Sequence, residues 1–315
     1  MNIQQLEYII AVDNYRHFVK AAEHCHITQA TLSMMVKKLE EELDVKIFDR
    51  SRQPVVPTEI GRKLIRQAKI ILQESNRLHT IVREEQGELK GELKIGIIPT
   101  LAPYLLPLFI HSFMEKHPLV KLKLSELTTD DIVRKLEQHD LDAGLLSTPL
   151  NHPSLVEQPL FYEDFVVYAS SEEKLLKKKY VLADDIDINR LCLLEEGHCL
   201  RAQVFNFCEL RNKNPHVSQL DFATGSIETL KRIVESNQGI TILPWLALKD
   251  MTAKQKNNIR YFKAPVPVRE IGLVTYRYYV KEKLISGLKE EILNNIPPGM
   301  KTASRREIVP PLQPT

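Results

Sequence analysis

Residues 17–43 read HFVKAAEHCHITQATLSMMVKKLEEEL, and this stretch decides the fold of the N-terminal part of the chain. Apolar side chains recur at helical spacing over residues 17–25 and again after Thr28, so we expect two helices there. Residues 27–29 form a tight connection between them, with Thr28 as the N-cap of the second helix. A further helix is expected upstream, over residues 4–12. Short helices joined by a small turn are typical of a helix-turn-helix, which places its second helix in the major groove of DNA.

The second helix of this pair is expected to bury one face and to present the other to DNA. Its apolar side chains form the buried face: Leu32, Met35, Val36, Leu39 and Leu43. The start of the helix and its opposite face carry small, polar and basic groups of the kind that contact phosphates and base edges. These candidate DNA-binding residues are Thr28, Gln29, Ala30, Thr31, Ser33, Met34, Lys37 and Lys38.

Two short apolar pieces, residues 45–48 and 55–56, bracket the sequence DRSRQP over residues 49–54. We interpret them as a two-stranded wing whose tip carries Arg50 and Arg52, placed to contact phosphates or the minor groove. The same region holds several carboxylates, so the charges also fit a solvated surface with no partner: Glu40, Glu41, Glu42, Asp44 and Asp49.

The run from Phe18 to Ser33, together with KKLEEEL at residues 37–43 and Phe48-Asp49-Arg50, resembles the winged helix-turn-helix of LysR-type transcriptional regulators. The resemblance implies a transcription regulator that binds double-stranded DNA. Two positions depart from the pattern. The family often has proline where this chain has Ala30, and polar residues where it has Met34 and Met35. Met34 is suited to contact thymine methyl groups, so the base preference does not follow from the family.

Residues 59–90 are expected to form a long helix followed by a hinge. Leu64, Ile71 and Leu78 fall seven residues apart, with Ala68, Ser75 and Val82 four residues after each of them. Such a seam on a long helix predicts pairing with a second copy of the chain. A homodimer places two recognition helices on successive turns of one duplex, so we expect a pseudo-palindromic operator.

Composition places the chain among ordinary globular proteins, since 43% of its 315 residues are hydrophobic and 27% are charged. A net charge of +2 gives no argument for or against nucleic acid. No apolar run approaches the roughly 18 residues that span a bilayer, and the start MNIQQLEYII lacks the features of a signal peptide. We therefore expect a cytoplasmic, nucleoid-associated protein with no membrane partner. In that compartment a permanent disulfide is not expected.

Residues 91–300 alternate strand and helix signals, which predicts α/β units with parallel sheets. Two small lobes joined by crossing strands would leave a cleft for a ligand. The proline-rich residues 301–315 are expected to be a disordered tail. The first lobe is expected to hold strands 93–98, 119–124, 141–146 and 271–276 and a helix over 283–293, and the second lobe strands 164–169, 191–194, 219–222 and 240–243.

Cys199 and Cys208 bracket a predicted short amphipathic helix, because apolar side chains recur at helical spacing between them. Nine helical rises would separate the two cysteines by about 13 Å along the axis. A disulfide needs Cα atoms within about 4.4–6.8 Å. The pair would therefore bond only if the helix unravelled, which is the behaviour of a switch. Position at the helix N-terminus, with His198 beside it and Arg201 two residues on, favours Cys199 as the reactive thiolate.

Other interpretations of the cysteines stay open at this point. Thiols in a reducing compartment are usually small buried hydrophobic groups, and we expect this of Cys25 and Cys192. Zinc is disfavoured because His198, Cys199 and Cys208 lack the paired close spacing of structural zinc ligands. A thioredoxin-type site is disfavoured because there is no Cys-x-x-Cys. We therefore expect neither a metal nor another cofactor.

The sequence GHCLR at residues 197–201, with Phe207-Cys208 nine residues after Cys199, resembles the peroxide-responsive activators of the LysR family. The matching residues also include 98–100, 226–230, 239–244 and 269–274. The resemblance implies a fold that is α+β and α/β: the winged helix-turn-helix of residues 1–58, the dimerisation helix and hinge of 59–90, and a two-lobed sensor like the periplasmic binding proteins over 91–300.

The same resemblance implies a non-enzymatic activator of oxidative-defence genes. Cys199 would be the peroxidatic thiol and Cys208 the resolving thiol. Thr100, Thr129, His198 and Arg269 would surround hydrogen peroxide. The implied partners are DNA, further copies of the chain in a homodimer or homotetramer, RNA polymerase and a cellular dithiol reductant.

Two rival functions fit parts of the sequence. One is a LysR-type regulator whose cleft binds a small organic effector while the cysteines are structural. The other is a thiol peroxidase with an accessory DNA-binding domain. The wing and the dimerisation helix have no role in catalytic turnover, so they argue against the second rival.

Overall fold

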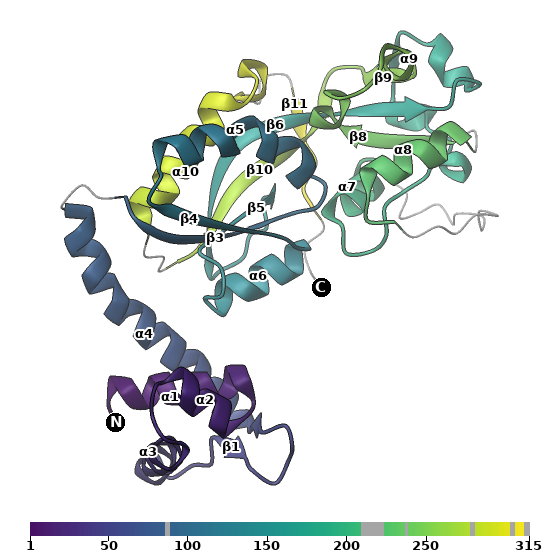
Figure 1. The fold of residues 1–315 in the computed structure, drawn as a ribbon. Coiled ribbons are helices and arrows are strands. Elements are labelled where there is room, and N and C mark those ends of the chain that lie inside the picture. The colour runs from purple at the N-terminus through teal and green to yellow at the C-terminus, as the bar shows by residue number, and fades with distance from the viewer. Residues whose placement is uncertain (86–88, 209–223, 237–238, 278–280, 303–305, 312–315) are drawn as a thin grey trace. The chain divides into compact units, whose positions relative to one another are not determined.

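A computed structural model describes residues 1–85, 89–208, 224–236, 239–277, 281–302 and 306–311. The chain divides into two compact units, Met1–Glu88 and Leu89–Thr315, and each is described by itself. Figure 1 shows the helices and strands of both.

The N-terminal unit begins with three helices: α1 (Ile3–Tyr15), α2 (Phe18–His24) and α3 (Gln29–Glu42). The Thr28 hydroxyl accepts a hydrogen bond from the Thr31 backbone N–H at 3.2 Å, which confirms Thr28 as the N-cap of α3. Leu32, Val36 and Leu39 are fully buried on the predicted face of that helix. Leu43 is a correction, since it lies past the end of α3 and is 37% exposed.

The wing is a two-stranded antiparallel ribbon of β1 (Phe48–Asp49) and β2 (Val56–Pro57). It is shorter than predicted because the backbone N–H groups of Ile47 and Phe48 donate to the buried Glu40 carboxylate, at 2.8 and 3.2 Å. These two amides therefore bind α3. The N-terminal unit continues into α4 (Glu59–Glu85), the predicted long helix.

Gly61 brings the first turn of α4 against the wing. A Cβ atom at this position would lie 2.0 Å from the Ile47 carbonyl oxygen, far inside van der Waals contact. We expect Gly61→Ala to destabilise the N-terminal unit by about 1–3 kcal/mol, because the helix must move off the backbone it packs on. Calorimetry of the full chain measures this, with Gly299→Ala as control, since nothing lies within 4 Å of a Cβ there. Equal unfolding temperatures for the two variants would contradict the expected clash.

The C-terminal unit contains a continuous mixed sheet in the order β4-β3-β5-β10-β6-β9-β7, with β8 also paired to β6 and β11 to β10. Its first lobe has β3, β4 and β5 parallel to one another, and β10 antiparallel to β5. The strands are β3 (Gly91–Ile97), β4 (Val120–Glu126), β5 (Ala143–Thr148), β6 (Leu155–Ala169), β7 (Tyr180–Val181), β8 (Ile240–Pro244), β9 (Ile259–Phe262), β10 (Val266–Tyr276) and β11 (Arg306–Ile308).

Strand β6 runs through both lobes of the C-terminal unit. Its first part pairs with β10, and its last five residues, from Phe165 to Ala169, pair with β8. Figure 1 shows α5 and α10 beside each other on the first lobe, and α8 beside β8 on the second. The α-helices are α5 (Ala102–Lys116), α6 (Thr129–Glu137), α7 (Cys199–Phe207), α8 (Ile227–Ser236), α9 (Ala253–Lys256) and α10 (Glu282–Asn295); the 3₁₀ helices are Lys174–Lys177, Ala183–Asp185, Ile188–Arg190, Trp245–Leu248 and Pro298–Met300.

The two-lobed α/β fold is confirmed, with four corrections. The sheet is mixed rather than parallel, because β10 returns antiparallel between β5 and β6. Residues 191–194 are not a strand, since only Leu191 makes a single bridge, to Ile240. Strand β6 begins at Leu155, well before the predicted 164. Residues 219–222 lie outside the described residues.

The fourth correction concerns the tail, residues 301–315. Residues 306–308 form β11, which pairs in parallel with β10, and Val309 is buried. The proline content that predicted disorder lies after this strand, at Pro310, Pro311 and Pro314, so it does not interrupt the pairing. Among the described residues, no helix has the length and hydropathy needed to cross a lipid bilayer.

Candidate functional site

Helix α7 confirms the predicted helix between the two cysteines. It begins at Cys199 and ends at Phe207, with His198 as N-cap and Cys208 as C-cap residue. Both cysteines are buried, and they are thiols rather than a disulfide. The rise of an α-helix separates them by about 13 Å along the axis, beyond the reach of a disulfide.

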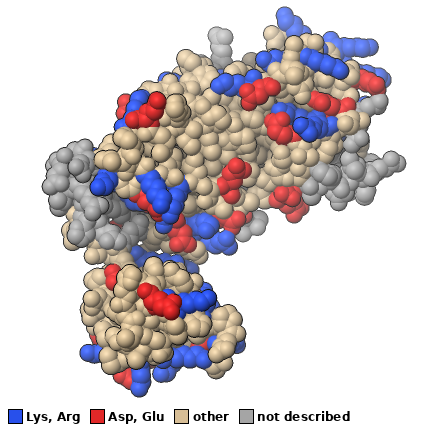
Figure 2. Space-filling view, viewed as in Figure 1, with Lys and Arg blue, Asp and Glu red and all other residues tan. Residues whose placement is uncertain are grey.

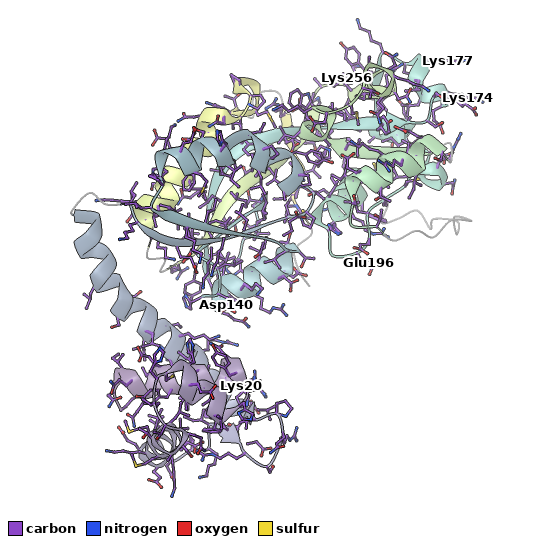
Figure 3. All side chains as sticks on the ribbon, viewed as in Figure 1. Lys20, Asp140, Lys174, Lys177, Glu196 and Lys256 are labelled. Atoms are coloured by element: carbon purple, nitrogen blue, oxygen red, sulfur yellow. The ribbon has the colours of Figure 1, made fainter. Side chains whose placement is uncertain are left out.

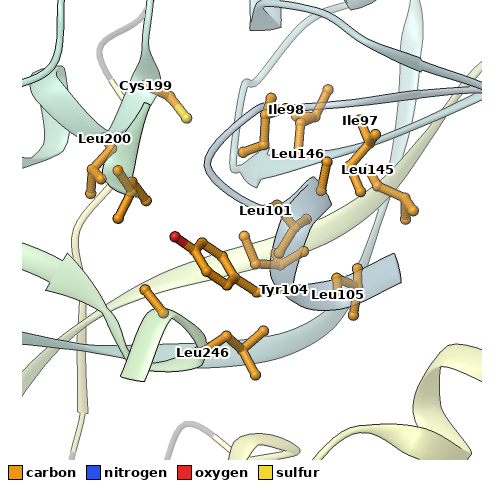
Figure 4. Packing of buried hydrophobic residues seen from close by; sticks show 14 of the residues in the cluster. Ile97, Ile98, Leu101, Tyr104, Leu105, Leu145, Leu146, Cys199, Leu200 and Leu246 are labelled. Carbon is orange, nitrogen blue, oxygen red and sulfur yellow. The ribbon is translucent and has the colours of Figure 1, made fainter. Parts of the chain in front are cut away.

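Cys199 contacts β5, on the first lobe. Its thiol lies 3.6 Å from the hydroxyl of Ser147, which is fully buried. Figure 4 shows the Cys199 sulfur pointing toward the side where Ile98 and Leu146 lie, across from α7. Ser147 was missed by the sequence reasoning. The feature that could have identified Ser147 is its position near the carboxyl end of β5, a strand parallel to β3. This is the edge at which α/β sheets bind ligands.

Arg269, on β10, is fully buried. Its side chain links Glu163 of β6 to Thr100 in the loop after β3. Its guanidinium donates to the Thr100 hydroxyl at 2.9 Å and to the Thr100 carbonyl oxygen at 3.1 Å. It also forms an ion pair with Glu163 of β6, at 2.7 and 2.8 Å from Oε2. The other oxygen of Glu163 accepts from the Leu246 backbone N–H at 2.7 Å. Glu163, also missed, thus fixes the guanidinium plane and directs it at Thr100.

His198 is the N-cap residue of α7, and Thr129 is the first residue of α6. His198 is buried, and its Nε2 lies 3.6 Å from a carboxylate oxygen of Glu195. In the described part of the chain the Thr129 Oγ1 is buried and has no hydrogen-bond partner. A Cβ at Gly197 would lie 3.9 Å from the Thr128 side chain, so the starts of the two helices are neighbours. An unpartnered buried hydroxyl of this kind is suited to receive a small polar ligand.

Of the predicted site residues, Thr100 and Arg269 contact each other, whereas the contact of Cys199 is with Ser147, which was not predicted. Among described residues, no side-chain hydrogen bond links these two pairs to each other. The loop ahead of α7 reaches the surface at Glu196 (Figure 3), and burial begins again at His198.

Arg201, which was expected to favour the Cys199 thiolate from two residues on, makes other contacts. Its guanidinium donates to the Leu194 carbonyl oxygen at 2.8 Å and stacks over the Phe205 ring. It holds α7 to the preceding loop instead. Cys25 and Cys192 were predicted to be buried thiols, and both are only partly buried. Burial raises the pKa of both thiols, and the Glu7 carboxylate adds to this at Cys25, so the thiolate is disfavoured at either position.

The candidate DNA-binding residues of α3 are largely open to solvent: Thr28, Gln29, Ala30, Thr31, Met34, Lys37 and Lys38 are exposed, and Ser33 is half-buried. Figure 2 shows basic side chains over the surface of this unit. Arg52 at the wing tip is 73% exposed and pairs with Asp49 at 3.2 Å.

Arg50 has a structural attachment that the sequence did not predict. It pairs with the buried Glu40 carboxylate and donates to the Ser33 hydroxyl, both at 3.2 Å. Its guanidinium also lies over the Phe18 ring, 4.9 Å from the centroid. The wing is therefore fastened to α3 and α2 through one side chain.

Comparison with known proteins gives the class. Residues 3–62 match the bacterial regulatory helix-turn-helix of the lysR family, and residues 86–294 match the LysR substrate binding domain. The chain therefore belongs to the LysR family of transcription regulators, and it is not an enzyme.

Within that family it is similar to OxyR. The chain is 34% identical over 276 residues to the DNA-binding transcriptional dual regulator OxyR of Escherichia coli K12, covering 87% of this chain and 89% of that protein. A full-length cysteine-to-aspartate variant of OxyR from Pseudomonas aeruginosa superposes with a TM-score of 0.77 at 31% identity, over 94% of this chain and 99% of that one. A peroxide-bound OxyR variant from Corynebacterium glutamicum gives a TM-score of 0.60 at 26% identity, over 93% and 92% of the two chains.

Proposed function

We propose that this protein is a LysR-type regulator that senses hydrogen peroxide by oxidation of Cys199 and disulfide formation with Cys208, and so switches transcription of oxidative-defence genes. The observation that carries the proposal is α7, which begins at one thiol and ends beside the other. Because an intact helix separates them, oxidation that joins them must change the fold of that segment. The likeness to OxyR proteins, one of them bound to peroxide, supports the same chemistry.

The chemistry follows from the groups around Cys199. The thiolate sulfur attacks one peroxide oxygen, the O–O bond breaks, and the departing hydroxide takes a proton to become water. Sulfur is oxidised to sulfenic acid and peroxide is reduced. Thr100, Thr129, His198 and Arg269 hold the peroxide and supply hydrogen bonds to the leaving oxygen. Cys208 then attacks the sulfenic sulfur, the S–O bond breaks, and a second water leaves.

The partners follow from the N-terminal unit and from the family. Exposed α3 residues and the wing bind a pseudo-palindromic double-stranded operator. Leu78, on the predicted seam of α4, is 67% exposed in the single chain. Pairing of two α4 helices would cover this side chain. The homodimer, assembled further into a homotetramer, acts on RNA polymerase in the nucleoid of the cytoplasm, and a cellular dithiol resets the disulfide.

Thiol labelling tests the proposal on the full chain. Protein is treated with peroxide, denatured so that burial no longer protects any thiol, alkylated and analysed by peptide mass spectrometry. We expect Cys199 and Cys208 to lose alkylation and to appear as one disulfide-linked pair, while Cys25 and Cys192 stay alkylated. If all four cysteines remain alkylated, the redox proposal fails and a regulator with an organic effector takes its place.

Ser147 is expected to assist the first step. Its hydroxyl accepts from the Cys199 thiol in the reduced protein, and by rotating it can donate to the thiolate. Hydrogen bonds to charged groups contribute about 1.5–3 kcal/mol, so Ser147→Ala should slow sulfenic acid formation by about tenfold. The measurement is the second-order rate constant for the reaction of Cys199 with peroxide, followed by trapping the sulfenic acid that forms.

Two variants serve as controls for that prediction. Ser147→Thr keeps the hydroxyl and should restore most of the rate. Thr241→Val removes a buried hydroxyl that donates to the Cys192 carbonyl oxygen, and it should leave the rate unchanged. A Ser147→Ala rate equal to that of the unaltered chain would show that the contact has no part in the chemistry.

A further inference from the structure

Residues 306–311 form an ordered segment, here called the C-terminal strap, which lies beyond the family match that ends at residue 294. It begins as β11, paired with residues 266–268 of β10. The Val309 backbone N–H donates to the Val268 carbonyl oxygen at 2.8 Å, and Arg306 pairs with Asp164 at 2.9 Å. The strap is thus fixed to β10 immediately beside Arg269.

The strap also binds helix α7 between its two cysteines. The Gln203 side-chain amide donates to the Val309 carbonyl oxygen at 2.7 Å, and both residues are buried. One helical turn on, the Asn206 amide donates to the Pro310 carbonyl oxygen at 3.3 Å. In the described part of the chain the Gln203 Oε1 has no hydrogen-bond partner, so the polar contact of this buried side chain is with the strap. Pro311 is buried as well.

We propose that the C-terminal strap is a latch that holds α7 in its helical form and thereby sets how readily the Cys199–Cys208 disulfide closes. The proposal rests on the function proposed above. Joining the two sulfurs requires the helix between them to unwind, and unwinding moves Gln203 and Asn206 away from the two carbonyl oxygens they bind. Strap binding and disulfide formation therefore oppose each other. By linkage the opposition is reciprocal: the strap disfavours closure, and closure releases the strap.

The latch acts on the second oxidation step and leaves the first unchanged. In that second step the Cys208 sulfur attacks the sulfenic sulfur of Cys199, the S–S bond forms, the S–O bond breaks, and the hydroxide leaves with the Cys208 proton as water. Sulfenic acid formation needs only Cys199 and peroxide, with α7 intact. The two steps separate experimentally, because a Cys208→Ser background stops the reaction at the sulfenic acid.

The experiment compares one substituted and two shortened proteins with the unaltered chain under hydrogen peroxide. Gln203→Met removes the amide while keeping volume and helix propensity similar, so α7 itself is not weakened. A chain that ends at residue 305 lacks the strap, and a chain that ends at residue 311 keeps it and is the matched control. Disulfide closure after sulfenic acid formation is followed by quenched alkylation and mass spectrometry.

Loss of one buried hydrogen bond is expected to speed closure by about tenfold in Gln203→Met, and loss of the strap by more. The chain ending at 311 should close at the original rate, and sulfenic acid formation should be equal in all of them. If closure is equally fast with and without the strap contacts, the latch is wrong while peroxide sensing stands. If Cys199 is never oxidised in any protein, the proposed function itself fails.

Hydrogen exchange on the unaltered protein gives a second test that does not depend on how the truncated chain folds. The Val309 amide is bonded to Val268 in the reduced form. We expect its exchange to become at least tenfold faster after oxidation, whereas amides in the β3–β4 pairing stay protected. Equal Val309 protection in the reduced and oxidised proteins would overturn the latch.

Discussion

Cys199→Ser is expected to abolish the peroxide response, with oxidation of Cys208, the remaining thiol at this site, reduced at least a hundredfold. A serine hydroxyl is not ionised near neutral pH and does not attack peroxide. The S–O bond of the first oxidation step therefore cannot form. Cys208, at the far end of α7, is buried beside the C-terminal turn of the helix and does not replace it. The measurement is peroxide-dependent transcription from a responsive promoter, together with thiol mass spectrometry.

The matched variant is Cys208→Ser, which separates sensing from locking. It should still form the Cys199 sulfenic acid, trapped by a diketone reagent, but should form no disulfide. Cys25→Ser, in the N-terminal unit, should behave as the unaltered chain. A Cys199→Ser protein that still switched transcription with peroxide would place the sensing group elsewhere.

Glu163→Ala is expected to destabilise the C-terminal unit by about 3–5 kcal/mol, because it leaves the fully buried Arg269 guanidinium without its counter-charge. The Leu246 backbone N–H loses its acceptor in the same change. Urea denaturation of the full chain, followed by the fluorescence of the single tryptophan, Trp245, reports on this unit. Trp245 begins the turn that Glu163 binds.

Two controls show whether charge burial is the cause. Glu196→Ala removes an exposed carboxylate and should change stability by less than about 0.5 kcal/mol. The double variant Glu163→Met with Arg269→Met removes both charges and should recover much of the lost stability, because a buried ion pair adds little over well-packed apolar groups. A double variant less stable than Glu163→Ala would contradict this account.

Local signals predicted much of the fold. The N-cap at Thr28, the three helices before the wing, and α7 between its cysteines all depend on residues within a few positions of each other. These elements came out of periodicity and capping alone. The direction of β10 did not, because it is set by pairing with β5 and β6, more than a hundred residues earlier.

The candidate site divides in the same way. His198 and Cys199 were found from a short motif, and Thr100 and Arg269 only through family resemblance. Glu163 and Ser147 were missed because their roles come from long-range contacts, across 106 and 52 residues of sequence. The tail was misjudged because composition describes a segment's own content and does not show that β10 has an edge ready to pair with it.

The attachment of Arg50 to Glu40, Ser33 and Phe18 has a consequence for how a signal reaches DNA. We expect α3 and the wing to move together, because tilting one against the other would break an ion pair to a buried carboxylate. We therefore expect regulation to change the distance and angle between two copies of this unit on DNA.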